Sequence, residues 1–268
     1  MIYDSYKRNH VVLPGRDKAL ESFLRQEYKG LKHKFRNGFN SNSEDALTWS
    51  CFELIKSLPS HKRFQVLSEI WEDSYDGKLR FPAEMRDLND DDINIFIGKE
   101  YRGSGTDESS EIDASIELPN ALIFIEAKLY SSISSKERPK KPWDQIQRKI
   151  RIGLDDPIRD NGHSIKNRDF YFILLDIAPR RRLMLRKSKT EALAKSGNGF
   201  HDKWKSAWWF NYYKNGWNGS LKPLRETIKD VSRIDPKEVA GNMGWLTWTD
   251  LFKDILRGMT GKESPDVL

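Results

Sequence analysis

The chain has 268 residues and a formal net charge of +6, with 37% hydrophobic and 32% charged residues. This length suits one large domain, or a core domain with a smaller attached part, and the composition is typical of a globular protein. The longest apolar run, residues 121–125, is too short to cross a bilayer, and no apolar signal region opens the chain. The single cysteine, Cys51, excludes an internal disulfide and a cysteine-based metal site, so we expect a cytoplasmic protein.

The charges are distributed unevenly along the chain. Residues 90–117 hold nine acids against two bases, whereas residues 136–189 hold sixteen lysines and arginines against seven acids. An acidic pocket beside a basic shell is what an enzyme needs when it acts with a cation on a polyanion. Uneven charge is also common on ordinary domains, but this asymmetry favours a nucleic-acid partner.

The N-terminal part, residues 1–42, is expected to be an arm with one helix. Apolar residues recur on one helical face between residues 16 and 29. A second helix is predicted to begin within residues 42–47, because Asn42 or Ser43 can cap it and acids fill its first turn. A third helix is predicted over residues 61–71.

Short apolar segments rich in β-branched residues predict the strands. They cover residues 93–98, 112–118, 122–129 and 170–177, with a helix expected over residues 143–152. We divide the chain after the arm into a core, residues 43–190, and a helical, aromatic-rich extension packed on it, residues 191–268. The order of elements predicts an α/β sandwich with a central mixed β-sheet flanked by helices.

Charged side chains interrupt two of these apolar strands. Strand alternation places Glu126 and Lys128 on one face, and a hairpin brings Asp113 of the preceding strand close to Glu126. Burying such groups is costly unless something compensates for it. Two carboxylates are suitable ligands for Mg²⁺ or Mn²⁺, which activates water, and a lysine can orient that water and offset charge on a phosphate. The alternative is a ladder of salt bridges on a solvent-facing edge strand.

Asp113, followed thirteen residues later by Glu126 and then by Lys128 on an apolar strand, resembles the signature of the PD-(D/E)xK nuclease superfamily. The resemblance covers roughly residues 43–178, and Ile112 stands where the family name has proline. It implies a restriction-endonuclease-like fold, a catalytic Asp113, Glu126 and Lys128, and metal-dependent hydrolysis of phosphodiester bonds, in DNA rather than RNA. Stand-alone nucleases of this kind are often bacterial or phage-defence and restriction effectors.

The same resemblance assigns further residues. The expected metal ligands are Glu44, Asp113 and Glu126. Asp45 is an alternative to Glu44, and either acid also suits the dipole of a helix start. Gln145, or alternatively Gln147, corresponds to the catalytic glutamine that follows the lysine in many members.

Four arginines are the expected nucleic-acid contacts: Arg148, Arg180, Arg181 and Arg182. A solvated basic loop is the alternative for the last three, and a solvated side chain for Arg148. An aromatic run with interleaved lysines, residues 203–217, suits stacking on bases, although such density more often closes a core.

For the remaining acids of the strands and for the histidines, the sequence indicates no catalytic or metal-binding role. Glu111 and Glu117 share a strand face with Asp113 by strict alternation, and we expect them to be exposed strand charges rather than accessory ligands. The five histidines show no metal-ligand spacing.

Two rival functions follow from the same residues. The first is a catalytically silent nucleic-acid-binding or scaffold subunit with the same fold. The second is a hydrolase with paired carboxylates, such as a glycosidase, in which the lysine has no role and no metal is needed. We expect no membrane partner, and a homodimer or a gating protein partner is compatible with the sequence.

Overall fold

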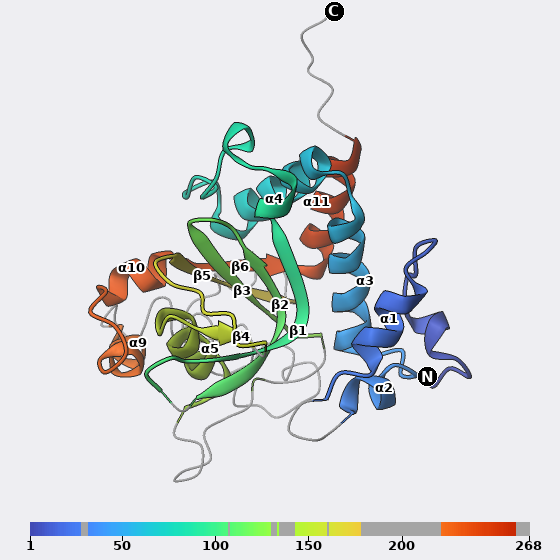
Figure 1. Cartoon of the computed structure of the whole chain (residues 1–268), viewed down its shortest axis with the longest axis horizontal. Helices are drawn as coiled ribbons and strands as arrows, with labels where there is room; N and C mark the ends of the chain where they lie inside the picture. Colours follow the sequence, from blue (N-terminus) through green and yellow to red (C-terminus); the bar gives the residue numbers. More distant parts are fainter. Residues whose placement is uncertain are drawn as a thin grey trace, which may run out of the picture.

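The computed structural model describes residues 1–27, 32–106, 108–129, 133, 143–159, 161–177 and 221–260. Its helices and strands, in chain order, are α1 (Asp17–Leu24), α2 (His33–Asn37), α3 (Glu44–Ser57), α4 (Ser60–Tyr75), β1 (Asn94–Arg102), β2 (Ser109–Glu117), β3 (Ala121–Ala127), α5 (Gln145–Leu154), β4 (Ile158–Arg159), β5 (Asp169–Asp176), α9 (Lys222–Ile228), α10 (Pro236–Gly241), β6 (Met243–Thr247) and α11 (Trp248–Thr260) (Figure 1). Among these described helices, none combines the length and the apolar character that crossing a membrane requires.

The strands form one six-stranded mixed sheet in the order β4-β1-β2-β3-β5-β6. β1, β2 and β3 are antiparallel neighbours, and the short β4 adds to the outer edge of β1. β5 and β6 run parallel to β3. Parallel neighbours need a crossover connection, and the one between β3 and β5 contains helix α5 and strand β4. The predicted α/β class with a mixed sheet flanked by helices is confirmed.

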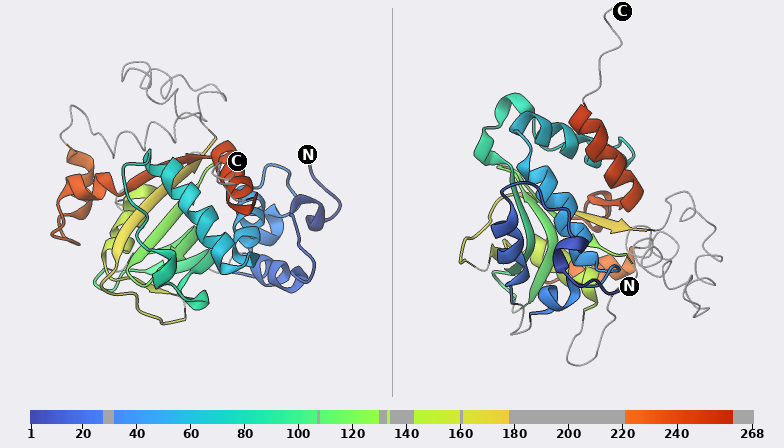
Figure 2. Two further views of the ribbon diagram at one scale, coloured as in Figure 1. Left: turned by 90° about the horizontal axis from the view of Figure 1, so that it is seen from above. Right: turned by 90° about the vertical axis from the view of Figure 1, so that its right-hand side faces the viewer.

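Helices cover both faces of this sheet (Figures 1 and 2). An apolar core lies on each face. Helices α1, α3, α4 and α11 contribute to one core, and α5, α9 and α10 contribute to the other. Strand β3 serves both, because Ile123 and Ile125 pack in the first core and Leu122 and Phe124 in the second. All seven β3 residues are buried and β3 has neighbours on both sides, so the edge-strand alternative is wrong.

The C-terminal part differs from its prediction at one element. Residues 243–247 were expected to be helical, but they form β6, which pairs in parallel with β5 and extends the core sheet. A strand buried throughout shows no alternation of apolar and polar residues, so its sequence does not distinguish it from a buried helix. The helix expected there begins directly afterwards, at Trp248.

In strands β1 and β2, the side chains that face each core change at the level of Asp113. Gly98 of β1, across the ladder from Asp113, has a φ of 61°, a conformation that glycine adopts without strain. Beyond this point the packing reverses: Ala114 lies in the core beneath α3 and α4, whereas Ile112 lies in the core beneath α5. Strict alternation along β2 therefore fails here, and Glu111 does not follow Asp113 into the same surroundings.

Candidate active site

The first turn of α3 places Glu44 at the end of strand β3. The Ser43 hydroxyl accepts a hydrogen bond from the Ala46 N–H at 3.2 Å and caps the helix. The Leu129 N–H donates to Glu44 Oε2 at 2.6 Å, and the Lys128 ammonium donates to Glu44 Oε1 at 3.3 Å. A helix cap thus fixes an acid against the segment that follows β3.

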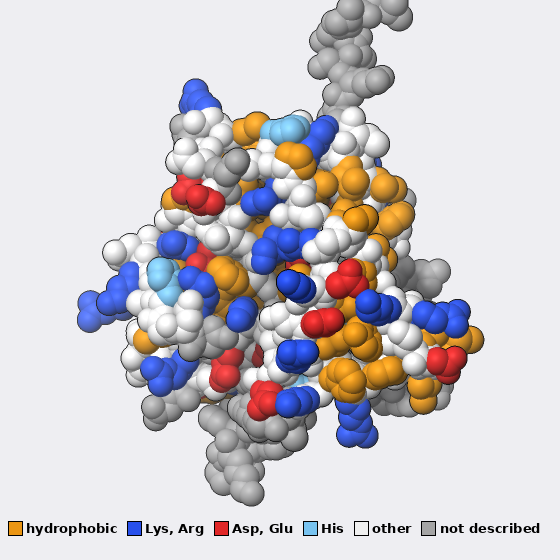
Figure 3. All heavy atoms as spheres, turned by 45° about the vertical axis from the view of Figure 1, so that its right-hand side comes forward, with side chains coloured by type: hydrophobic (Ala, Val, Ile, Leu, Met, Phe, Trp, Pro, Cys, Tyr) orange, Lys and Arg blue, Asp and Glu red, His pale blue; other side chains and the backbone are white. Residues whose placement is uncertain are grey.

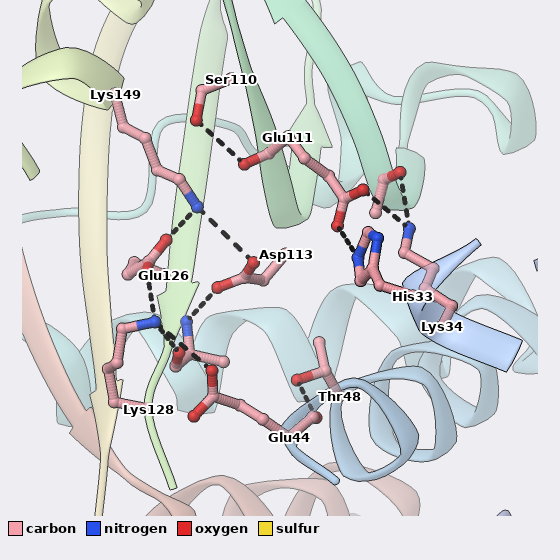
Figure 4. A network of polar contacts seen from close by, with 12 residues as sticks. His33, Lys34, Glu44, Thr48, Ser110, Glu111, Asp113, Glu126, Lys128 and Lys149 are labelled. Atoms are coloured by element: carbon pink, nitrogen blue, oxygen red, sulfur yellow. Dashed lines mark hydrogen bonds and ion pairs between the residues drawn. The ribbon is translucent and has the colours of Figure 1, made fainter. Parts of the chain in front are cut away.

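The hairpin of β2 and β3 brings Asp113, Glu126 and Lys128 together (Figure 4). Asp113 Oδ2 accepts a hydrogen bond from the Ala127 N–H at 2.7 Å, which ties the carboxylate to the end of β3. The Lys128 Nζ lies 2.6 Å from Glu126 Oε1 and donates to the Ala127 carbonyl at 2.9 Å. Together with Glu44, these three side chains form the cluster that we call the β3-end site.

Lys149 of α5 is a member of this site that the sequence interpretation missed. Its side chain is 1% exposed, and its ammonium contacts Glu126 Oε2 and lies 3.5 Å from Asp113 Oδ1. A signal for it exists in the sequence: Lys149 stands three residues after Ile146 and beside Ile150, both of which are buried in the core. A lysine on the apolar stripe of a helix needs buried acids opposite it.

Burial and charge act against each other throughout the β3-end site. Burial, followed by the nearby Asp113, raises the pKa of Glu126. Burial also opposes ionisation of Asp113, but Lys149 and Lys128 outweigh it and hold the pKa of Asp113 below its usual value. Burial would lower the pKa of both lysines, yet the facing carboxylates outweigh it and keep both pKa values raised. The site is thus a network of charged groups that depend on one another.

A second cluster of ionisable groups adjoins the site on the side of α2 (Figure 4). Glu111 Oε2 lies 3.3 Å from the buried Lys34 ammonium, and Glu111 Oε1 lies 3.6 Å from His33 Nε2. His33, Asp45 and Glu111 each offer a ligand atom, all within 4.8 Å of one another. Burial, Asp113 and Glu111 raise the pKa of Asp45. His33 has no metal-ligand spacing in the sequence, but the fold brings it close to the carboxylates of Asp45 and Glu111.

Glu111 and Glu117 are not the exposed strand charges that we expected. The Glu111 side chain is 14% exposed and is paired with α2. Glu117 is 3% exposed and accepts a hydrogen bond from the Tyr101 hydroxyl at 2.9 Å, and it pairs with Arg159 and Arg168. Glu117 is a structural residue at the far end of β2, because its partners neutralise it there.

The balance of charge across the two clusters leaves an excess of acids. The acids are Glu44, Asp45, Glu111, Asp113 and Glu126, and the lysines are Lys34, Lys128 and Lys149. The acids thus outnumber the lysines by two, and His33, whose pKa is raised mainly by its hydrogen bond to Glu111, offsets one of these acids when it is protonated. Hard carboxylate oxygens with such an excess fit a divalent cation such as Mg²⁺ or Mn²⁺. Asp113 and Glu44 keep 19% and 23% of their side chains exposed, so solvent reaches these carboxylates.

The two candidate glutamines have different surroundings. Gln147 is buried, accepts a hydrogen bond from the Asp144 N–H at 3.2 Å, and donates to the Thr227 hydroxyl at 2.8 Å. These bonds cap α5 and tie it to α9. Gln145 is the first residue of α5 and lies one turn before Lys149, so helical spacing directs it to the same side. Gln145 is thus the better placed of the two.

The predicted nucleic-acid contacts are described in part. Arg148 is partly buried, and its Nε has no hydrogen-bond partner among the described residues. Arg180, Arg181 and Arg182 lie outside the described residues, as does the aromatic run at 203–217. Over the described residues of the face in Figure 3, lysines and arginines are dispersed among acidic and apolar side chains.

No family model matches this chain, and neither a curated protein nor a solved structure matches it. The chemistry of the β3-end site therefore rests on its own residues. They offer oxygen ligands for a divalent cation, a lysine beside those ligands, and an opening to solvent through Asp113 and Glu44.

Proposed function

We propose that this chain is a metal-dependent nuclease with a restriction-endonuclease-like fold that hydrolyses phosphodiester bonds in DNA. The observation that carries the proposal is the meeting of Glu44 from α3 and Glu126 from β3 on Lys128, with Asp113 of β2 held beside them by the Ala127 N–H. Burying so many charges at one strand end is costly, and the fold alone gives no reason for it. A metal-assisted reaction on a polyanion would give a reason for these buried charges.

Glu44, Asp113, Glu126 and Lys128 each have a task in this reaction. Glu44, Asp113 and Glu126 would hold the Mg²⁺ or Mn²⁺ ion, which when bound lowers the pKa of water and offsets charge on the scissile phosphate. Lys128 orients the attacking water and stabilises negative charge that develops on the phosphate oxygens. Glu44 also positions Lys128 through their contact at 3.3 Å. Gln145 is a further proposed catalytic residue, and Arg148 and residues 180–182 are the proposed contacts to the nucleic acid.

The test is cleavage of supercoiled plasmid and linear DNA in Mg²⁺, in Mn²⁺ and in EDTA. We expect the wild type to cut only with metal, and Asp113→Ala and Lys128→Ala to lose activity by roughly 100-fold or more. Lys78→Ala is the control, because Lys78 is 76% exposed and pairs only with the neighbouring Asp76 in the described part of the chain. Circular dichroism verifies that each variant is folded.

The possible outcomes separate the rival functions. Cutting that persists unchanged in EDTA would refute the metal mechanism. Binding of DNA without cutting in either metal would favour the silent nucleic-acid-binding subunit. Neither binding nor cutting of DNA, with cleavage of RNA instead, would keep the chemistry and correct the substrate.

A further inference from the structure

The β3-end site holds a second lysine for which the proposed reaction has no role. Lys128 meets Glu126 Oε1 at 2.6 Å, while Lys149 meets the other oxygen, Glu126 Oε2. Lys149 also faces Asp113 Oδ1 at 3.5 Å. It is one of the most deeply buried lysines of the described chain, and its ammonium stands between the two carboxylates (Figure 4).

Lys149 contacts one oxygen of each of the two carboxylates. Asp113 Oδ2 accepts a hydrogen bond from the Ala127 N–H at 2.7 Å, and Glu126 Oε1 lies 2.6 Å from the Lys128 Nζ. The remaining oxygens are Asp113 Oδ1 and Glu126 Oε2, and both face the Lys149 ammonium. A divalent ion held by Asp113 and Glu126 would therefore compete with Lys149 for these carboxylates.

We propose that Lys149 is a resident counter-ion that holds Asp113 and Glu126 in place without metal and leaves this position when a divalent cation binds. The inference rests on the proposed function, since it assumes that these carboxylates are the metal ligands. An ammonium and a divalent cation repel each other strongly in a partly buried site. The flexible four-carbon stem of lysine lets the charge move while α5 stays packed.

Lys34 provides a matched comparison. It is as deeply buried as Lys149, at 1% exposure, and it lies 3.3 Å from Glu111. Its ammonium, however, also donates to the Gly98 carbonyl at 3.0 Å and to the Gln26 side chain. Within the described residues, Lys149 has the two carboxylates alone as partners. Lys34 is fixed by neutral acceptors, whereas Lys149 depends on the anions that a metal ion would take.

The experiment compares the full chain with Lys149→Met and Lys34→Met, without nucleic acid. Electron paramagnetic resonance of free Mn²⁺ gives the affinity for the ion, and thermal unfolding in EDTA and in Mn²⁺ gives Tm. We expect Lys149→Met to lower Tm in EDTA by roughly 10 °C, because it leaves buried acids unpaired. It should also bind Mn²⁺ about tenfold more tightly than the wild type and regain most of the lost Tm in Mn²⁺. Lys34→Met should lose stability without this recovery.

The results distinguish this inference from the proposed function. A folded Lys149→Met that binds Mn²⁺ as the wild type does, or more weakly, would overturn the counter-ion role while leaving the metal site intact. No Mn²⁺ binding by any of the proteins would overturn both. If Lys149→Met does not fold, Lys149→Gln decides, because its amide still donates to Glu126 without carrying charge.

Discussion

A buried carboxyl group between α4 and α11 makes the stability of this protein depend on pH. Asp254 is completely buried, and its oxygens have no hydrogen-bond donor among the described residues. Burial, followed by the neighbouring Asp73, raises its pKa to about 8. Lys253 opposes this shift, and Arg257 lies 3.7 Å from Asp254 Oδ1. In the folded protein Asp254 is therefore protonated at neutral pH, and it can donate to Asp73.

The direction of the effect follows from the raised pKa. Between the ordinary value of 3.8 and about 8, the folded state binds a proton that the unfolded state has released. The stabilising contribution is therefore complete below pH 3.8 and is lost as the pH rises to about 8. The shift of about four units sets an upper limit of roughly 5 to 6 kcal/mol. About three of these units fall between pH 5 and pH 8, which limits the change in that interval to roughly 4 kcal/mol, and we expect about 2 kcal/mol there because α11 can relax and admit water to the carboxylate.

The perturbation is Asp254→Asn, which keeps the shape and a donor toward Asp73 but cannot ionise. Urea unfolding at pH 5 and pH 9 should show the variant gaining about 2 kcal/mol relative to the wild type over this interval. Asp250→Asn is the control on the same helix. Burial would raise the pKa of Asp250, but Lys253 and Thr247 outweigh it and lower that pKa, so no gain is expected between pH 5 and pH 9. A difference between Asp254→Asn and wild type that stays constant from pH 5 to pH 9 would refute the reasoning.

Two further substitutions test the site and its support. Glu44→Gln keeps an acceptor for the Leu129 N–H, so we expect the free energy of unfolding to change by less than about 1 kcal/mol. Plasmid cleavage should fall at least tenfold. Unchanged cleavage would show that Glu44 is not part of the active site. Gly98→Ala requires a positive φ and pushes a Cβ into the Lys34 ammonium, so it should cost roughly 2 to 4 kcal/mol in urea unfolding. Gly77→Ala has a similar φ but open space, and should cost about 1 to 2 kcal/mol; equal losses would show that Lys34 does not constrain Gly98.

Much of the sheet and the placement of Asp113, Glu126 and Lys128 followed from local patterns. Apolar segments bounded by turn residues marked β2, β3 and β5, and a capping serine marked the start of α3. A tight hairpin joins β2 and β3, so the spacing along the chain was enough to set Asp113 beside Glu126. These features depend on neighbours in sequence, which is why the sequence predicted them.

The charges that complete the site depended on tertiary structure. Lys149 meets Glu126 across 23 residues of chain, and its place on the apolar stripe of a helix indicates burial without showing which acids it meets. His33 and Asp45 reach Glu111 only because β2 changes faces beside Gly98 and turns Glu111 toward α2. Strand β6 joined the sheet although its buried residues carry no alternation.

The sequence of this protein therefore determined strands β2, β3 and β5, the helix cap and the acids with their lysine, because each is encoded within a few neighbouring residues. Packing of α5 and α2 against the sheet decided which further charges compensate these acids. The energy of a buried charge depends on all charges around it, and those lie on elements far apart in the chain.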